Sequence, residues 1–425
     1  MSSPTTATPP LPATALVDIF VARQPIFDAN GNVYAYELLY RRNSAATHAD
    51  GETAEAMAAE VLVHSFLNIG VDRLTGGTKA FLNFTREMLI HGVYQLFNPN
   101  EVVIELLESV HPDAEVNAAA EALVKAGYTL ALDDFEYSPA HEPLLKLAKI
   151  VKLDVLNKSP EELGRMAKQF KSRGLQVLAE RVETAEVQKL CASLGYTLYQ
   201  GYYFSKPEVL AKRDLSAGQM TILRLMNQLR DVESSDTKLE ESFKTDVSLT
   251  YKLLRAVNSA ASGGRGIESI RHAVRLVGRA ELHKWLALLL VSSVSGAGGT
   301  GEELVHTAIR RARMCELIAM DRGDKRGAEA LFMVGLFSLL DAIMKIPMSE
   351  LLDRIDLATE VRRALLVRSG PFAPTLALVE AYERGAWDVA TGEAALLGIP
   401  AQVVSDLYIA SLAWARQQIQ KAGEN

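Results

Sequence analysis

Acidic and amide side chains recur at the ends of short apolar runs throughout the first 205 residues. The run that begins at Tyr128 ends in Asp133-Asp134-Phe135, and five other segments repeat the arrangement. A buried strand does not tolerate unpaired charge, so a series of such endings predicts one shared polar site. Its candidate members are Glu37, Asn83, Glu105 with Glu108, Asp133 with Asp134, Lys152 with Asp154, and Glu180 with Glu183.

The elements that would position these residues are alternating strands and helices between about Leu16 and Pro207. Helical stretches are expected at 52–70, 112–127, 160–174 and 184–195, and several stop at a glycine and begin near Ser, Thr or Pro. This alternation predicts a parallel sheet covered by helices, which in an α/β barrel presents its chemistry at the C-terminal ends of the strands. An open doubly wound sheet is the alternative.

The pattern changes after Lys206-Pro207, where strand signals become scarce. In residues 246–258, Leu249, Leu253, Leu254 and Val257 recur at helical spacing, whereas the Ser- and Gly-rich segment 292–301 is typical of a loop. We therefore expect a disordered tail at 1–15, a β/α barrel at 16–207 and an all-α domain at 208–425.

Composition limits the class of protein. A length of 425 residues suggests two or three domains, and a net charge of −7 gives no support for a nucleic-acid polymer as partner. The two cysteines, Cys191 and Cys315, lack a C-x-x-C partner, so a reducing compartment fits best. The N-terminus lacks the features of a signal peptide, and the apolar stretches at 285–291 and 330–340 are too short to span a membrane. We expect a cytoplasmic protein.

Each motif taken singly has a plainer interpretation. Asp133-Asp134 could cap a helix or form a turn, and Glu180 with Glu183 could complement a helix dipole. Lys152 and Asp154 alternate on one strand face and could form a structural ion pair. The collective case is stronger, because six strand ends would otherwise carry polar residues by coincidence.

These residues, taken together, resemble the EAL domains. The segment Tyr36-Glu37-Leu38-Leu39-Tyr40-Arg41 is similar to the signature that names the family, and Arg23-Gln24-Pro25-Ile26 resembles the stretch that precedes it. Further blocks follow in family order at Asp133-Asp134-Phe135, Lys152-Leu153-Asp154, 179–183 and 200–207. The resemblance covers nearly the whole first domain.

EAL domains are β/α barrels that hydrolyse cyclic di-GMP to linear pGpG with Mg²⁺ or Mn²⁺. The resemblance implies that two metal ions are held by Glu37, Asn83, Glu105, Asp133, Asp134 and Glu180, whose oxygen atoms suit hard cations. Lys152 would hold the attacking water or stabilise the transition state. Substrate contacts are implied for Gln24, Arg41 and Gln200, and supporting places for Glu108 and Glu183.

Three departures from the family pattern bear on activity. Leu38 replaces an alanine, Glu136 replaces a glycine in the loop after Asp134, and Arg181 replaces a glycine beside Glu180. Glycine permits positive φ more readily than glutamate does, so the loop's shape is put in doubt. Arg181 would bring a cation towards the metal ligands.

The second domain resembles the HDOD domains, which are all-α relatives of HD hydrolases. The segment 246–260 is similar to their opening block, Ser269-Ile270 with 273–278 to the next, and the order of the two domains is that of the YuxH-like cyclic di-GMP signalling proteins. No His-Asp dipeptide is present, and His272, His283 and His306 stand alone. We interpret the domain as non-catalytic, with Trp285, Trp387 and Trp414 in its core.

Three functions remain open at this point. The chain could be a metal-dependent cyclic di-GMP phosphodiesterase with a regulatory helical domain, a receptor that binds the nucleotide without turnover, or a scaffold that acts through the HDOD domain. An unidentified protein partner of that domain is expected, and a homodimer is also expected because EAL relatives often dimerise.

Overall fold

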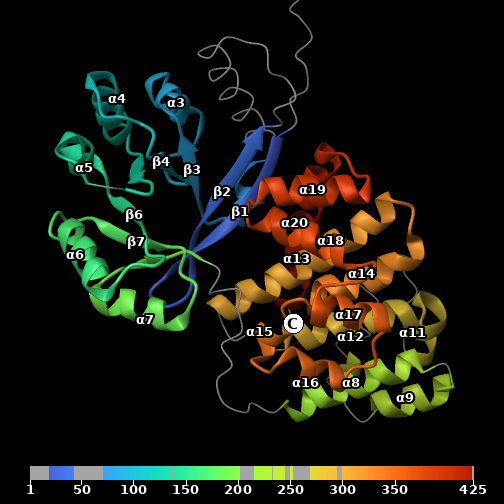
Figure 1. Cartoon of the computed structure of the whole chain (residues 1–425). Coiled ribbons are helices and arrows are strands. Elements are labelled where there is room, and N and C mark those ends of the chain that lie inside the picture. The colour runs from blue at the N-terminus through green and yellow to red at the C-terminus, as the bar shows by residue number, and fades with distance from the viewer. Residues whose placement is uncertain are drawn as a thin grey trace, which may run out of the picture.

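The computed structural model describes residues 19–42, 70–135, 137–201, 215–231, 233–244, 249–251, 269–293 and 299–423 (Figure 1). Several features expected from the sequence lie outside these ranges. They are the tail at 1–15, most of the helices at 52–70 and 246–258, half of the loop at 292–301, and Glu136.

Eight strands close into a barrel in chain order. Their bounds are β1 Ile19–Asp28, β2 Val33–Arg42, β3 Lys79–Phe84, β4 Val102–Leu106, β5 Thr129–Leu132, β6 Ile150–Asp154, β7 Gln176–Glu180 and β8 Leu198–Tyr199. Phe27 of β1 pairs with Tyr199 of β8, which closes the sheet. The α/β barrel predicted from the sequence is confirmed, and the open sheet is excluded.

The first strand departs from the predicted parallel order. β1 runs antiparallel to both β2 and β8, whereas β2 to β8 are parallel throughout. Only residues 29–32 connect β1 to β2, and the carboxylate of Asp28 accepts hydrogen bonds from the backbone N–H groups of Asn30 and Asn32. A connection this short can join only antiparallel strands, because a parallel crossover needs a dozen or more residues.

Short helices connect the parallel strands and cover the outside of the barrel (Figure 1). They are α2 Val71–Thr75, α3 Arg86–Ile90, α4 Ala114–Lys125, α5 Glu142–Leu147, α6 Pro160–Lys171 and α7 Ala185–Leu194, with 3₁₀ turns at Val93–Leu96 and Pro139–His141. Ser159 and Glu162 form a capping box on α6, and the Thr184 hydroxyl caps α7. The helices predicted at 112–127, 160–174 and 184–195 are therefore confirmed within a few residues.

Helices make up the second half of the chain. They are α8 Ala217–Arg230, α9 Asp236–Lys244, α11 Ile270–Val277, α12 Arg279–Ser292, α13 Thr300–Asp321, α14 Lys325–Phe337, α15 Leu340–Met344, α16 Met348–Asp353, α17 Thr359–Val367, α18 Ala373–Glu383, α19 Trp387–Leu397 and α20 Ala401–Gly423. Among the described residues no single helix could span a membrane, although α19 and α20 meet the length and composition requirements as a pair bent by 104°.

The helical half packs directly on the first strand of the barrel. β1 lies against α18 and α20, and one hydrophobic cluster joins Val21 of β1 to Leu378, Tyr382 and Tyr408 of these helices. A second cluster, around α8, α12 and α14, belongs to the helical half alone. Because burying apolar surface is the main stabilising term in folding, the shared cluster ties the two halves together.

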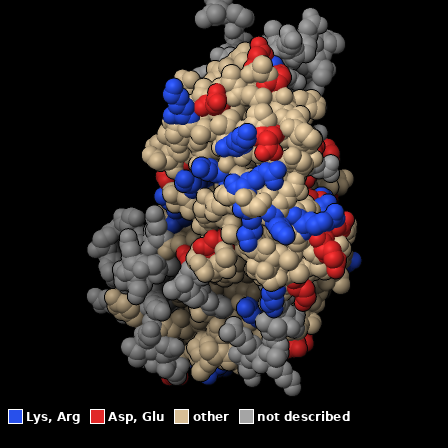
Figure 2. Space-filling model, turned by 90° about the vertical axis from the view of Figure 1, so that its left-hand side faces the viewer, with Lys and Arg blue, Asp and Glu red and all other residues tan. Residues whose placement is uncertain are grey.

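The face at the outer side of the barrel carries charges of both signs. Figure 2 shows lysine and arginine side chains in a band across the middle of this face, with acidic side chains above and below it.

Candidate active site

The inside of the barrel is closed at one level by a layer of apolar side chains. Each strand contributes one fully or nearly fully buried residue to this layer, namely Ile26, Ala35, Phe81, Val103, Ala131, Ile150, Leu178 and Leu198. In a strand, the next side chain on the same face lies two residues further along. The layer therefore determines which residues come next inside the barrel.

The next inward position on every strand is polar. Two residues beyond the apolar layer, or two before it on the antiparallel β1, the sequence places Gln24, Glu37, Asn83, Glu105, Asp133, Lys152, Glu180 and Gln200. We call these eight residues the polar layer. Each was a candidate from the sequence, so the structure brings together residues that are up to 176 positions apart in the chain.

Lys152 lies at the centre of the polar layer. Its Nζ is 2.9 Å from a carboxylate oxygen of Asp133, 2.9 Å from one of Glu180 and 3.2 Å from one of Glu37, and it also forms an ion pair with Glu105. The side chain of Lys152 is 1% exposed and that of Glu105 is fully buried. The plainer alternative, an ion pair of Lys152 with Asp154, gives way to this arrangement, in which Lys152 pairs with four carboxylates and Asp154 pairs with Arg181.

One ammonium does not balance four carboxylates, and the pKa values reflect this imbalance. Burial and then the neighbouring carboxylates raise the pKa of Glu105 well above its usual range, against the opposing effect of Lys152. The same causes raise the pKa of Glu180 to about 7. Burial lowers the pKa of Lys152, but the carboxylates outweigh burial and hold that pKa well above its usual range.

Amide side chains complete the polar layer. Gln200 donates from Nε2 to Glu37 at 2.8 Å and to Gln24 at 3.1 Å, and Asn83 donates to the other oxygen of Glu37 at 3.1 Å. Gly201 has φ +154°, and a Cβ there would lie 2.3 Å from the backbone nitrogen of Val182. A glycine is therefore required directly after Gln200, because the chain there runs against the backbone of Val182, just beyond β7.

Two residues that follow the polar layer adopt left-handed backbone. Asp134 has φ +36° and Arg181 has φ +55°. Nε of Arg181 donates to Asp154 at 2.8 Å and a second nitrogen forms an ion pair with it. The cation that the sequence places beside Glu180 is thus paired with Asp154, and Lys152 is the cation among the carboxylates.

The remaining predicted residues lie outside the polar layer. Asp134, Glu108 and Glu183 are exposed, and Glu183 lines the cavity above the layer. Arg41 belongs to β2 on the same face as Glu37, but its side chain lies outside what the structure describes.

The donor chemistry of the polar layer fits a hard cation. Among the described residues, Oε2 of Glu105 and Oε1 of Gln200 are buried and have no hydrogen-bond partner. Both atoms are acceptors, and together with the excess of carboxylates they favour a bound positive charge. Within the same residues no three acidic, histidine or cysteine side chains are placed to share a metal ion. Lys152 lies where the carboxylates converge, so a metal ion would share them with it.

A cavity of about 590 Å³ opens above the polar layer, and both halves of the chain line it. The barrel contributes Gln24, Glu37, Asn83, Glu180, Glu183 and Gln200, and the helical half contributes Glu303, Thr307, Arg310, Arg311, Glu383, Arg384 and Trp387. This volume is ordinary for a small-molecule site. The helical residues were missed from the sequence, although the run Arg310-Arg311-Ala312-Arg313 among the buried apolar residues of α13 is a signal that could have found them.

The chain matches two family descriptions in succession. Residues 17–207 match the EAL domain and residues 216–356 match the HDOD domain. YuxH, an uncharacterized protein of Bacillus subtilis (strain 168), is 35% identical over 380 residues, which are 87% of this chain and 92% of that protein. The chain belongs to the EAL–HDOD family.

A second relative of the EAL–HDOD chain has a named activity. The cyclic di-GMP phosphodiesterase CdgJ of Vibrio cholerae serotype O1 is 32% identical over 403 residues, which are 93% of this chain and 92% of that protein. The probable cyclic di-GMP phosphodiesterase PdeA of Escherichia coli (strain K12) is 33% identical over 129 residues, 27% of this chain and 17% of that protein. The polar layer lies within the EAL domain, and α13 within the HDOD domain.

Proposed function

We propose that the EAL–HDOD protein hydrolyses cyclic di-GMP to linear pGpG with Mg²⁺ or Mn²⁺ at the polar layer of its barrel. The single observation that carries the proposal is the excess of carboxylates around Lys152, at the floor of a cavity large enough for a nucleotide. Membership of the family and similarity to CdgJ support the same reaction.

The metal ligands in this proposal are oxygen donors at the strand ends. We assign Glu37, Asn83, Glu105, Asp133 and Glu180 to the metal ions, with the exposed Asp134 joining a second ion. Bound divalent cations would acidify the attacking water and neutralise charge that develops on the phosphorus. Glu108 and Glu183, both exposed just after strands β4 and β7, would support the loops around the site.

Other residues would bind and orient the nucleotide. Lys152 places a positive charge among the carboxylates, where it would stabilise an anionic transition state. Gln24 and Gln200 are joined by a hydrogen bond and present amide groups to the cavity, which suits recognition of a guanine edge. Arg41 would hold a phosphate with its guanidinium.

A second candidate function is binding without turnover, and Arg181 favours it. Arg181 has left-handed backbone directly after Glu180 and donates to Asp154, so the proposed metal ligand Glu180 is flanked by a constrained position. A ligand displaced by a fraction of an ångström can lose much of the rate while binding persists.

The experiment is incubation of the purified protein with cyclic di-GMP and Mn²⁺ or Mg²⁺, with pGpG followed by chromatography. Glu37→Ala is the test variant, and Glu161→Ala, an exposed acidic residue on α6, is the matched control. We expect product from the wild type and the control and none from Glu37→Ala.

Other outcomes discriminate between the functions. Nucleotide binding without pGpG would make the protein a receptor, and the absence of both would assign the function to the helical domain. Unchanged turnover in Glu37→Ala would remove the polar layer from the mechanism.

A further inference from the structure

The wall of the cavity formed by the helical domain differs in charge from its floor. The charged lining residues of α13, α18 and the loop that follows are three arginines, Arg310, Arg311 and Arg384, and two glutamates, Glu303 and Glu383. The barrel contributes three glutamates, Glu37, Glu180 and Glu183, and two arginines, Arg23 and Arg181. Arginines therefore outnumber glutamates by one along the helical wall, and glutamates outnumber arginines by one on the barrel side.

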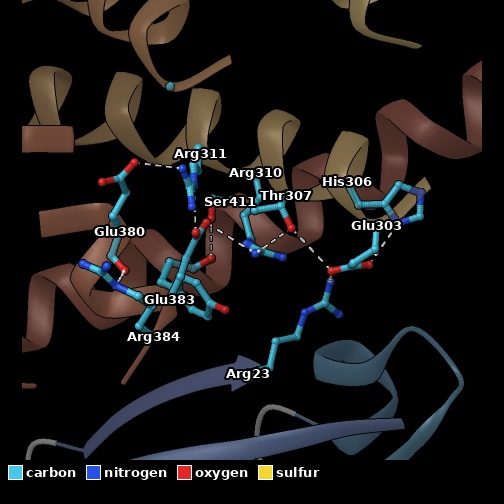
Figure 3. Close-up of polar contacts among 12 residues, drawn as sticks. Arg23, Glu303, His306, Thr307, Arg310, Arg311, Glu380, Glu383, Arg384 and Ser411 are labelled. Carbon is cyan, nitrogen blue, oxygen red and sulfur yellow. Dashed lines mark hydrogen bonds and ion pairs between the residues drawn. The ribbon is translucent and has the colours of Figure 1, made fainter. Parts of the chain in front are cut away.

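Arg310 is buried but incompletely bonded. One nitrogen, Nη2, is 3.3 Å from the carboxylate of Glu383 and donates to the Thr307 hydroxyl at 3.3 Å. Its Nε and Nη1 have no hydrogen-bond partner among the described residues, although the side chain is only 5% exposed. Figure 3 shows Arg310 on α13 between Glu303 and Glu383, on the side that faces β1. Unused guanidinium donors buried beside a cavity favour the binding of an anion there.

Glu383 has a closer cationic partner than Arg310. Arg311 donates to Glu383 at 2.7 Å and to Glu380 at 3.0 Å, both shorter than the contact of Arg310. Glu303 is held by Tyr36, whose hydroxyl donates to it at 2.6 Å, and Arg23 lies 4.0 Å away. Arg310 can therefore bond an incoming anion without leaving a buried carboxylate unpaired.

The wall lies directly beside the catalytic strand. Gly385 has φ +66°, and a Cβ there would lie 2.7 Å from Cδ1 of Leu39, the next inward residue after Glu37 on β2. The connection at 384–386 therefore passes close to β2, and its Arg384 lines the cavity. A ligand at the polar layer would meet this wall as soon as it extends along the cavity.

We propose that Arg310, Thr307 and Arg384 form a phosphate subsite, contributed by the HDOD domain, for the half of the cyclic dinucleotide that is not hydrolysed. A cyclic dinucleotide has two phosphodiesters, and only one of them can react at the polar layer at a time. The second phosphate would accept hydrogen bonds from Nε and Nη1 of Arg310. The Thr307 hydroxyl, which donates to Glu303 at 3.5 Å, and Arg384, whose Nε donates to the backbone of Glu380 at 3.1 Å, would turn towards the phosphate. The inference rests on the proposed function and makes the helical domain part of the substrate site.

The test uses the full chain and separates substrate binding from turnover. Arg310→Lys keeps the buried positive charge and removes the fork of donors, Arg384→Ala removes an exposed arginine at the rim, and Thr307→Val removes one hydroxyl at nearly constant volume. Arg322→Ala, an exposed arginine at the end of α13, is the matched control.

We expect the KM for cyclic di-GMP to rise about tenfold in Arg310→Lys and Arg384→Ala, and less in Thr307→Val, since a charge-assisted hydrogen bond has about this effect. The kcat should change by less than about twofold, because these residues do not contact the scissile bond. If the wild type binds without turnover, the Kd from calorimetry takes the place of KM.

Three results would overturn the inference. An unchanged KM in Arg384→Ala, in a wild-type background that turns over, would overturn the subsite and leave the proposed function standing. A rise in kcat in these variants would mean that the wall obstructs the site. A wild type that neither binds nor hydrolyses cyclic di-GMP would overturn both proposals. If Arg310→Lys fails to fold, Arg384→Ala alone decides.

Discussion

Two buried clusters of charged side chains lie on either side of the strands β1 and β2, and they shift the pKa of a glutamate in opposite directions. In the polar layer, burial and the neighbouring carboxylates raise the pKa of Glu180 to about 7, despite Lys152. In the cluster between the domains, burial raises the pKa of Glu303, but the bond with His306 and the charges of Arg23 and Arg310 outweigh burial and leave the pKa at about 2.

The difference follows from the balance of charge in each cluster. Four carboxylates surround one ammonium in the barrel, whereas at the domain boundary Glu303, Glu380 and Glu383 face four arginines, namely Arg23, Arg310, Arg311 and Arg368. A buried cluster with an excess of carboxylates favours an additional cation, whereas one without that excess can keep its carboxylates ionised. The comparison favours a cation site in the barrel. The other cluster is a joint between the domains, in which Arg310 keeps donors that form no hydrogen bond within the described residues.

Replacing Lys152 should give the largest effect. Lys152→Met removes the cation of the polar layer, so we expect turnover to fall by about 10²–10³-fold, the usual loss when a group that stabilises the transition state is removed. Mn²⁺ binding should persist or strengthen, since the ammonium no longer shares the carboxylates. Chromatography of pGpG and calorimetric titration of Mn²⁺ check the two parts. A variant that retains wild-type turnover would exclude Lys152 from the reaction.

Neutralising Glu303 should destabilise the joint in a pH-dependent manner. Its pKa is lowered to about 2 from an ordinary 4.5 in the unfolded chain, so its stabilisation is present above pH 4.5 and is lost as the pH falls towards 2. A shift of this size corresponds to about 3 kcal/mol.

The measurement for Glu303 is the melting temperature between pH 7 and pH 3. Glu303→Gln should melt below the wild type at pH 7, and the gap should narrow, without closing, as the pH falls from 4.5 to 3. Glu302→Gln, a neighbour whose side chain is 46% exposed, is the matched control and should shift little. A gap that stays constant with pH would contradict a role for the charge of Glu303.

Changing Arg181 should have the smallest effect. Arg181→Gly removes an ion pair whose arginine is 57% exposed, which is worth at most about 1 kcal/mol, and relieves a left-handed backbone that costs a similar amount. We expect little change in stability and less than about a threefold change in turnover. A tenfold gain in turnover would show that the pair with Asp154 restrains the site after all.

The polar layer could be predicted from the sequence because strand alternation is strict. Apolar runs that end in a polar residue give six of its members, Glu37, Asn83, Glu105, Asp133, Lys152 and Glu180, whereas Gln24 and Gln200 came from the resemblance to EAL domains. The antiparallel direction of β1 could not be predicted from strand alternation, because a single strand has no intrinsic direction relative to its neighbours. The length of the connection at residues 29–32 was the available signal.

The contribution of the helical domain was not predictable from periodicity. Arg310 and Arg311 occupy buried positions on α13, where a helical pattern leads one to expect apolar residues. Their partners, Glu380 and Glu383, lie 69 to 73 positions further along the chain. Pairing over such separations depends on the tertiary packing of α13 on α18, which no local signal contains.

His306 stands alone in the sequence analysis, but it lies beside Glu302 and Glu303 in the structure. These residues are three and four positions apart, which is one helical turn, so this contact could have been predicted from the sequence.

The most direct test of the account is a calorimetric titration of the metal-free protein with Mn²⁺, beside Glu105→Gln and the control Glu161→Ala. Glu105 is fully buried in the polar layer, and neutralising it reduces the excess of negative charge without opening a cavity. The account predicts binding by the wild type and the control, and binding weakened at least about tenfold in Glu105→Gln. Equal Mn²⁺ affinity in all three proteins, or no binding by the wild type, would contradict the claim that the unbalanced carboxylates of the barrel form the metal site.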